Sequence, residues 1–170
     1  MSLLDKEPVK RVENFLSKFK SDLNIIALDT SAKTALEAAS SLSCDVGAIV
    51  KSLIFRTEEK FLLCLVAGDK RASLSKIKKI LNIKDASMAS AEDVKSVTGF
   101  TIGGVAPIAH LNKLDVFIDN SLERFEHLYA AAGHPKCVFK INFKDLLKIT
   151  NGSIREITEW NNLNYLITHY

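Results

Sequence analysis

The segment Ile49–Phe55 constrains the fold most, because it reads as a buried strand with a lysine at its third position. Side chains of a strand alternate between two faces, so Lys51 shares the more apolar face with Ile49 and Leu53. Lysine is rarely buried without a partner, since desolvating an ammonium is costly. Three explanations stay open. A carboxylate of the chain pairs with Lys51, the cavity receives an anionic ligand, or an edge-strand lysine extends its stem to water.

Short apolar runs and short amphipathic segments alternate along the rest of the chain. The runs 49–55 and 61–67 flank a polar turn and predict a hairpin. Further strands are expected at 24–28, 116–118, 128–132, 138–141 and 154–157, and helices at 9–19, at 32–42 after a cap at Thr30 or Ser31, from caps at Ser73 and Ser90, and at 143–149. This mixture predicts an α+β fold, in which helices flank a mixed, mostly antiparallel, curved sheet.

Length and composition fit a single domain of a soluble protein. The chain has 170 residues, of which 47% are hydrophobic and 25% charged. We expect one domain over residues 1–159 and a tail over 160–170 without an assigned role. No apolar stretch approaches the roughly 20 residues that cross a bilayer, and the charged start lacks the apolar core of a secretory signal. A cytoplasmic protein without a membrane partner is therefore expected.

The charge balance is only weakly informative about partners. The net charge is +3, from 23 basic and 20 acidic residues, which does not by itself indicate nucleic acid. Lysines concentrate in the segment 70–84, where the apolar side chains fall on one face of a helix. The lysine face is either simply solvated or directed at phosphates, and both interpretations stay open.

The segment Gly103–Pro107 predicts a loop whose backbone approaches another group closely. Its two glycines lack a Cβ that would block the approach, and its proline fixes the exit. Free N–H groups in such a loop can donate to a phosphate or carboxyl-like oxygen. The loop matches neither the dinucleotide-binding nor the P-loop pattern, and a tight structural turn is the alternative.

Two histidines lie near glycines and are candidates for chemistry. His110 follows the glycine loop, and His134 lies in an alanine-rich segment that ends in Gly-His-Pro. With Cys137, these histidines could supply three zinc ligands, but a fourth is not evident. The sequence has no G-x-S-x-G elbow and no defined cysteine–histidine pair. We therefore expect no metal, no cofactor and no nucleophilic side chain.

Taken together, four segments resemble the YbaK/ProX family of aminoacyl-tRNA deacylases, which are free-standing relatives of the editing domain in bacterial prolyl-tRNA synthetase. The segments that carry the resemblance are Ile49–Leu53, Thr98–His110, Ile118–Asp119 and Ala130–Pro135. They occur in the family's order between Val9 and Ile157. The lysine strand combined with the G-x-x-x-P loop makes the resemblance specific.

The resemblance implies a trans-editing hydrolase. Such an enzyme removes a small wrongly attached amino acid, alanine-like or cysteine, from the 3′ end of a misacylated tRNA, here expected to be tRNA(Pro). Prolyl-tRNA synthetase is a second candidate partner. The implied catalytic residues are Lys51, which would position the terminal nucleotide, and Gly103. The implied substrate-binding residues are Ser52, Gly104, Val105, Ala106, Pro107, His110, Gly133 and His134.

The chain departs from the family pattern at three places. Ala106 replaces a common serine or proline, and Ala109 replaces a frequent glycine, so its methyl should narrow the pocket or shift the loop. The usual A-G-x-R-G is replaced by Ala132–Pro135, which leaves His134 as a candidate substrate contact. These departures bear on amino-acid specificity more than on reaction class.

Two other functions stay open at this point. A non-catalytic module could bind a tRNA end or a synthetase without cleavage, and Ala106 and Ala109 are the features that favour it. A small-molecule ester or amide hydrolase could use the same pocket and would be indifferent to the tRNA body and to salt.

Overall fold

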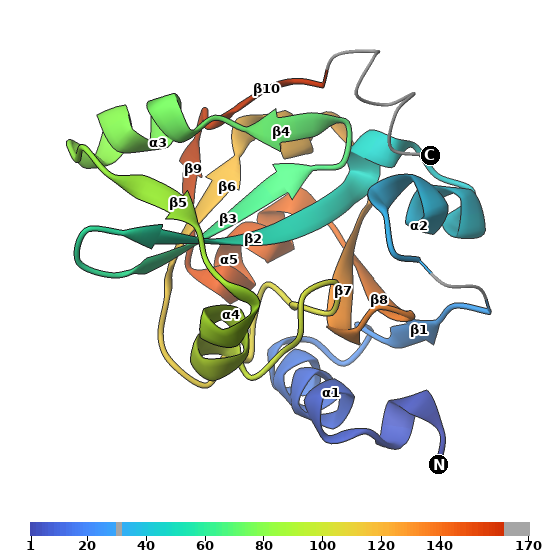
Figure 1. Cartoon of the computed structure of the whole chain (residues 1–170). Helices are drawn as coiled ribbons and strands as arrows, with labels where there is room; N and C mark the ends of the chain where they lie inside the picture. The colour runs from blue at the N-terminus through green and yellow to red at the C-terminus, as the bar shows by residue number, and fades with distance from the viewer. Residues whose placement is uncertain (30–31, 162–170) are drawn as a thin grey trace.

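A mixed sheet of eight strands lies at the centre of the fold, with helices around it (Figure 1). The structure is a computed structural model that describes residues 1–29 and 32–161. Its strands are β1 (Ile25–Ala27), β2 (Ile49–Thr57), β3 (Phe61–Ala67), β4 (Lys70–Ala72), β5 (Ala86–Met88), β6 (Asp115–Asp119), β7 (Leu128–His134), β8 (Cys137–Ile141), β9 (Ser153–Arg155) and β10 (Thr158–Trp160). Its α-helices are α1 (Glu7–Phe19), α2 (Ala35–Leu42), α3 (Leu74–Leu81), α4 (Ala91–Thr98) and α5 (Phe143–Thr150).

The sheet combines antiparallel and parallel neighbours. Its order is β1-β8-β7-β2-β3-β6-β9, with β5 paired to the far end of β2. The pairs β1–β8, β7–β8, β2–β3 and β2–β5 are antiparallel, whereas β2–β7, β3–β6 and β6–β9 are parallel. A separate small sheet pairs β4 with β10 in antiparallel register. The expected α+β class with a mixed sheet is confirmed.

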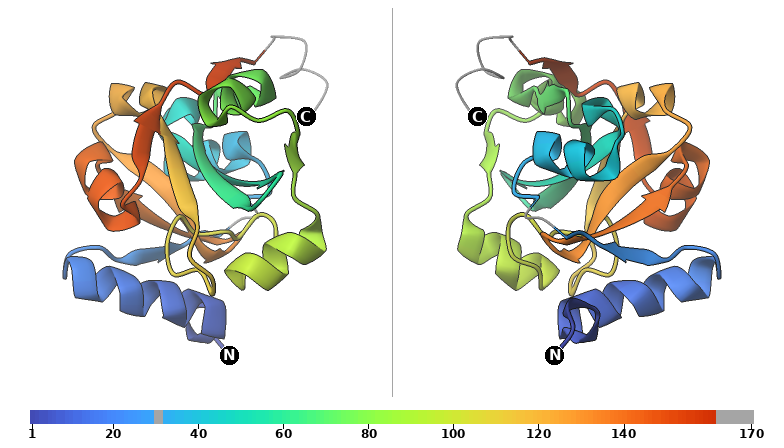
Figure 2. Two further views of the ribbon diagram at one scale, coloured as in Figure 1. Left: turned by 90° about the vertical axis from the view of Figure 1, so that its left-hand side faces the viewer. Right: turned by 90° about the vertical axis from the view of Figure 1, so that its right-hand side faces the viewer.

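The predicted hairpin is the central pair β2–β3, and the period-two pattern of β2 places its two faces against different helices. Val50 and Ile54 pack with α1 in the largest apolar core. Phe55 packs with Ile77 of α3, and Ile49 packs with the alanines of α2. The helices α1 and α3 accordingly lie on opposite sides of the sheet (Figure 2).

Short polar side chains begin four of the helices. Thr34, Ser73, Ser90 and Asn142 each accept a hydrogen bond from the backbone N–H three residues further on. Such caps satisfy amides that have no partner within the helix. The caps predicted at Ser73 and Ser90 are confirmed. Thr30 and Ser31, expected to cap the second helix, lie outside the described residues, and Thr34 is the cap that the structure describes.

The segment expected as a last strand over 154–157 differs from the prediction. The strand β9 ends at Arg155 and β10 begins at Thr158, because Ile157 makes its backbone hydrogen bonds outside a strand ladder. Its N–H donates to Asp119 and its carbonyl accepts from the Ser73 amide, at 3.0 and 2.7 Å. Trp160, assigned by sequence to the tail, belongs to β10. The remainder of that tail, 162–170, lies outside the described residues.

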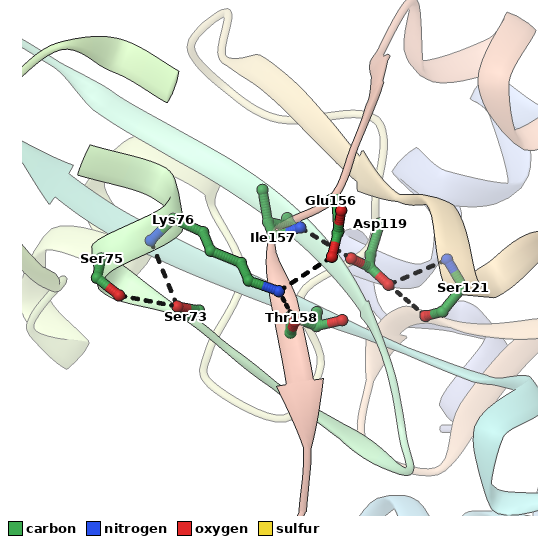
Figure 3. Close-up of polar contacts among 8 residues, drawn as sticks. All are labelled: Ser73, Ser75, Lys76, Asp119, Ser121, Glu156, Ile157 and Thr158. Carbon is green, nitrogen blue, oxygen red and sulfur yellow. Dashed lines mark hydrogen bonds and ion pairs between the residues drawn. The ribbon is translucent and has the colours of Figure 1, made fainter. Parts of the chain in front are cut away.

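A polar network holds residues 156–158 against the main sheet (Figure 3). Asp119, at the end of β6, is fully buried and accepts from the amide and hydroxyl of Ser121 as well as from Ile157. From α3, the Lys76 ammonium donates to the Thr158 carbonyl at 2.7 Å and pairs with Glu156 at 3.2 Å. These bonds fix β10 alongside β4.

We predict that Asp119→Ala lowers the free energy of unfolding by about 2–4 kcal/mol, because it removes charge-assisted bonds and leaves buried donors unpaired. Urea unfolding followed by circular dichroism measures the change. The matched control is Asp115→Ala on the same strand, where the carboxylate is exposed and pairs with Lys60. Little change is expected there. Equal losses in the two variants would contradict the role assigned to Asp119.

Candidate active site

Lys51 is half-buried in β2, and its ammonium donates a hydrogen bond to the carbonyl of Lys70 in β4. Its pKa is lowered by burial, an effect that the Asp69 carboxylate partly offsets. Asp69 itself is engaged by the Arg124 guanidinium through two bonds of 2.9 and 2.8 Å. In the part of the chain that the structure describes, the hydrogen-bond partner of Lys51 is thus a neutral carbonyl rather than a carboxylate.

The edge of β2 beside Lys51 is open. The neighbouring strand β7 pairs with β2 only at Ile49 and Val50, and β5 pairs only from Phe55 onward. Residues 51–53 therefore have β3 on one side and neither of these strands on the other. In the described ranges the Ser52 hydroxyl is buried without a hydrogen-bond partner. The gap in the sheet thus coincides with Lys51 and Ser52, two of the polar residues of the strand.

A cavity of about 300 Å³ lies at this gap. Lys51, Ser52 and Leu53 line it from β2, and Gly103 and Val105 line it from the glycine loop. The remaining lining residues are Ala32, Lys33, Thr34, Ala35, Ala38, Ile49, Val50, Ile102, Tyr129, Ala131, Pro135 and Val138. A mostly apolar wall with a few polar groups is typical of a small-molecule or substrate-end site.

Two neighbouring glycines bring the loop to this cavity for different reasons. Gly103 has φ +92°, a conformation that side-chain-bearing residues rarely adopt. A Cβ on Gly104 would lie 3.0 Å from the backbone N and Cα atoms of His134, so crowding excludes a side chain there. Gly104 thereby lets the loop pack backbone to backbone on the Gly-His-Pro segment.

Arg11 of α1 fastens both ends of the loop. Its Nε donates to the Ala109 carbonyl at 2.8 Å, and another guanidinium nitrogen donates to the Thr98 carbonyl at 3.2 Å. The guanidinium also lies over the Phe100 ring, 4.5 Å from its centroid. Sequence reasoning missed Arg11, because an arginine in an amphipathic helix looks like any solvated residue.

His110 braces the loop from within the protein rather than from the cavity. Its Nε2 is 2.7 Å from the Ala106 carbonyl, and its ring meets the Phe100 ring edge-on. Burial lowers the pKa of His110, the hydrogen bond to Ala106 opposes that shift, and the Arg11 charge adds to it. The imidazole is therefore neutral near pH 7 and donates to the Ala106 carbonyl.

The structure brings together four of the residues predicted from sequence. Lys51, Ser52, Gly103 and Val105 line the cavity, whereas Gly104, Ala106, Pro107, His110, Gly133 and His134 do not. Ala106 is fully buried, and Pro107 and His110 line a different cavity of about 500 Å³. Ala109, whose methyl was expected to narrow the pocket or shift the loop, lines that second cavity and not the one at Lys51, and the shift of the loop stays a prediction.

Tyr129, Ala131 and Pro135 are cavity residues that sequence reasoning missed. The alternation along β7 could have indicated Tyr129 and Ala131, because it places both residues on one face of the strand. His134 accepts a hydrogen bond at Nδ1 from the Lys136 amide at 3.1 Å, and its contact to substrate stays a prediction. Burial lowers the pKa of His134 as well, helped by the nearby Lys6 and Lys136 charges.

Metal ligation and thiol chemistry find little support in the geometry. The described ranges contain no group of three His, Cys, Asp or Glu side chains arranged to hold a metal ion. Burial raises the pKa of the Cys64 thiol to about 12 and also raises the pKa values of Cys44 and Cys137, which disfavours their thiolates. Across residues 1–29 and 32–161, no helix is long and apolar enough to cross a membrane.

Comparison with known proteins assigns this site to a family. The family model described as an aminoacyl-tRNA editing domain matches residues 29–149. The chain therefore belongs to the aminoacyl-tRNA editing domain family, as its resemblance to YbaK/ProX proteins implied. The match includes β2, the glycine loop and β7, all of which contribute residues to the lining of the cavity.

Individual relatives fall into two groups. The proline–tRNA ligase of Caldicellulosiruptor bescii is 31% identical over 130 residues, which are 76% of this chain but only 22% of the ligase. The Bacillus subtilis protein YwhH is 30% identical over 139 residues, covering 81% of this chain and 88% of that protein. A solved structure of a candidate trans-editing enzyme for prolyl tRNA synthetase is 34% identical, with a TM-score of 0.86, and covers 91% of this chain and 98% of that one.

We predict that Arg11→Met lowers the free energy of unfolding by about 2–3 kcal/mol, because the loop carbonyls lose a charged donor. Amides of the loop 99–109 should also exchange with solvent faster, which hydrogen-exchange mass spectrometry measures. Lys10→Met is the control, since Lys10 makes an exposed ion pair with Glu13. Unchanged exchange in the loop of Arg11→Met would contradict the anchoring role.

The lowered pKa of His110 predicts a pH dependence of stability. An unfolded imidazole titrates near about pH 6.5. Below that pH the unfolded state binds a proton that the folded state does not yet bind, and this proton binding stabilises the unfolded state relative to the folded one. Stability is complete above this value and is lost as the pH falls toward the folded pKa. Urea midpoints between pH 7.5 and 5 should therefore fall more steeply for the wild type than for His110→Gln. Parallel profiles would show that His110 does not contribute.

Proposed function

We propose that this chain hydrolyses the ester between a small, wrongly attached amino acid and the 3′ end of tRNA, with tRNA(Pro) as the carrier. The observation that carries the proposal is that one cavity combines a glycine loop with an ammonium whose hydrogen-bond partner, among the described residues, is a backbone carbonyl. Membership of the editing-domain family and the similarity to a domain-sized part of a proline–tRNA ligase support the same reaction.

Lys51 is the proposed contact to the terminal nucleotide. An ammonium that is partly desolvated gains most from an anion, and a nucleic-acid phosphate supplies one. The carbonyl of Lys70 holds the ammonium at the cavity in the meantime. The lysine is thus already oriented when substrate arrives, so little side-chain entropy is lost on binding.

The loop is the proposed site of the ester carbonyl. The Gly104 amide is already bonded to the Thr101 carbonyl at 3.0 Å, which leaves the amides of Gly103 and Val105 as candidate donors to the developing oxyanion. One such donor contributes about 3–4 kcal/mol to transition-state stabilisation. Correct placement of the attacking water could contribute roughly 7–11 kcal/mol more.

Among the residues that the structure describes, those that line the cavity include no carboxylate and no imidazole. A general base must therefore come from elsewhere if water is to be activated near neutral pH. The ribose hydroxyl next to the ester is the proposed assistant, so the substrate itself supplies the group that the cavity lacks. Water then adds to the ester carbonyl, the bond to the ribose oxygen breaks, and that oxygen takes up the proton.

The cavity size favours a small amino acid. A synthetase discriminates against a side chain smaller by one methylene by only about 1–3 kcal/mol, so a second, smaller site is needed to remove the product. Val105, Ala131 and Val138 give the 300 Å³ cavity an apolar wall suited to an alanine-like or cysteine side chain.

Hydrolysis is favoured over binding without cleavage. The sequence features behind the binding-module alternative were Ala106 and Ala109, and both lie away from the lining of the Lys51 cavity. They therefore give no reason to regard that cavity as inactive.

We expect Lys51→Ala to lower kcat/KM for aminoacyl-tRNA hydrolysis by at least about 100-fold while the protein stays folded, because one charged contact to the substrate is lost. Release of labelled amino acid from pre-charged tRNA measures the rate. Lys140→Ala on β8, an exposed strand lysine, is the matched control and should keep wild-type rates. Wild-type turnover in Lys51→Ala would remove Lys51 from the mechanism.

A panel of labelled aminoacyl-tRNAs tests the reaction and the specificity together. Loss of ester from tRNA(Pro) carrying a small amino acid supports the proposal, and binding without loss of any ester would favour the module instead. The salt dependence of binding distinguishes the third alternative, a small-molecule ester or amide hydrolase. Affinity for tRNA should weaken steeply as salt rises, whereas a small-molecule hydrolase would be insensitive to both salt and the tRNA body.

A further inference from the structure

An exposed indole lies beside the candidate site. Trp160, the single tryptophan of the chain, is 60% exposed on β10. The Lys70 ammonium is 4.3 Å and the Arg124 guanidinium 5.1 Å from the centre of its ring. An exposed aromatic ring flanked by cations is the arrangement that proteins use to hold single-stranded nucleic acid.

The two cations at the ring differ in whether their charge is available to bind a phosphate. Arg124 is committed to Asp69 and donates to the Ser121 carbonyl at 2.7 Å, so its charge is neutralised and its position fixed. No carboxylate pairs with Lys70 among the residues that the structure describes, and its ammonium contacts the indole. Lys70 therefore keeps a positive charge that a phosphate can neutralise.

The indole is connected to Lys51 through one residue. Lys70 accepts the Lys51 hydrogen bond with its carbonyl and places its own ammonium over Trp160. Trp160 and Lys70 are also direct partners in the β10–β4 pair, and the Cα atoms of such partners lie about 4.5–5.5 Å apart. The ring and the proposed terminal-nucleotide contact are thus neighbours in space.

Bonds within the protein also hold the backbone on both sides of Trp160 in place. The network of Figure 3 fixes residues 156–158, and Arg71 pairs with Glu159 at 3.0 Å across the small sheet. On the far side of Trp160, the Asn161 amide donates to the Asp69 carbonyl at 3.4 Å. A rigid exposed ring loses little freedom on binding, which favours a recognition role.

We propose that Trp160 is a stacking platform for a nucleotide of the single-stranded RNA 3′ end that precedes the terminal one, and that Lys70 binds the adjoining phosphate. The inference rests on the proposed function, since the terminal nucleotide is the one assigned to the Lys51 cavity. A stacking contact accepts any base, because every base has a π-face. The platform therefore contributes affinity and register to RNA binding without reading sequence.

Fluorescence tests the contact directly, because the emission of the protein comes from one tryptophan. The probe is an uncharged RNA minihelix with its single-stranded 3′ end, compared with the same minihelix lacking that end. We expect saturable quenching with the intact end and little with the truncated one. A response to added prolyl-tRNA synthetase and none to RNA would overturn the proposal in favour of a protein partner.

Kinetics on aminoacyl-tRNA give the second measurement. Trp160→Ala should raise KM about ten-fold with kcat nearly unchanged, and Trp160→Phe should recover most of that loss because it keeps a stacking ring. Lys70→Met should raise KM and reduce its salt dependence. The matched control is Phe15→Ala, an exposed aromatic on α1, which should leave KM unchanged.

The outcomes separate the two proposals. Hydrolysis by the wild type with an unchanged KM in Trp160→Ala and no quenching would overturn the platform and leave the hydrolase. Quenching by the intact RNA end without hydrolysis of any ester would overturn the hydrolase and support the platform. Circular dichroism confirms that each variant is folded, and the Phe variant keeps the test valid if the Ala variant is unstable.

Discussion

The interruption in the pairing of β2 is the constraint on which the site depends. Because β7 leaves the strand after Val50 and β5 joins it only at Phe55, a short stretch in the middle of the sheet has no neighbour on one side. In a continuous sheet a neighbouring strand would occupy this edge of β2 and close it to a ligand. Instead, a cavity that Lys51 and Ser52 help to line lies at the gap, and the Lys51 ammonium donates to a backbone carbonyl in β4.

The residues around the cavity divide into those that line it and those that hold it open. Gly103 and Val105 form part of its wall, whereas Arg11, His110 and the fully buried Ala106 fix the loop from behind. This division explains why the wall can be short of reactive groups. The protein supplies charge, shape and backbone donors, and the proposed chemistry takes its remaining proton transfers from water and the substrate.

Sequence patterns predicted the parts that depend on local periodicity. Alternation predicted the β2–β3 hairpin, and hydroxyl caps predicted the starts of α3 and α4. The patterns did not predict which residues of the glycine loop line the cavity at Lys51. Gly103 lines that cavity, whereas Pro107 lines the second one. They also missed the short strands β4, β5 and β10, which carry no apolar alternation of their own, and β10 follows Ile157, which a hydrogen bond to Asp119 holds in place.

Lys70 touches Lys51 through its main chain and Trp160 through its side chain. Any residue at this position would still present the carbonyl, so the amino acid there is free to vary without disturbing the ammonium in the cavity. The proposed binding of nucleic acid and the proposed cleavage of the ester can therefore evolve separately in this fold. Homologues with different residues at positions 70 and 160 would then share one chemistry while differing in how tightly they hold RNA.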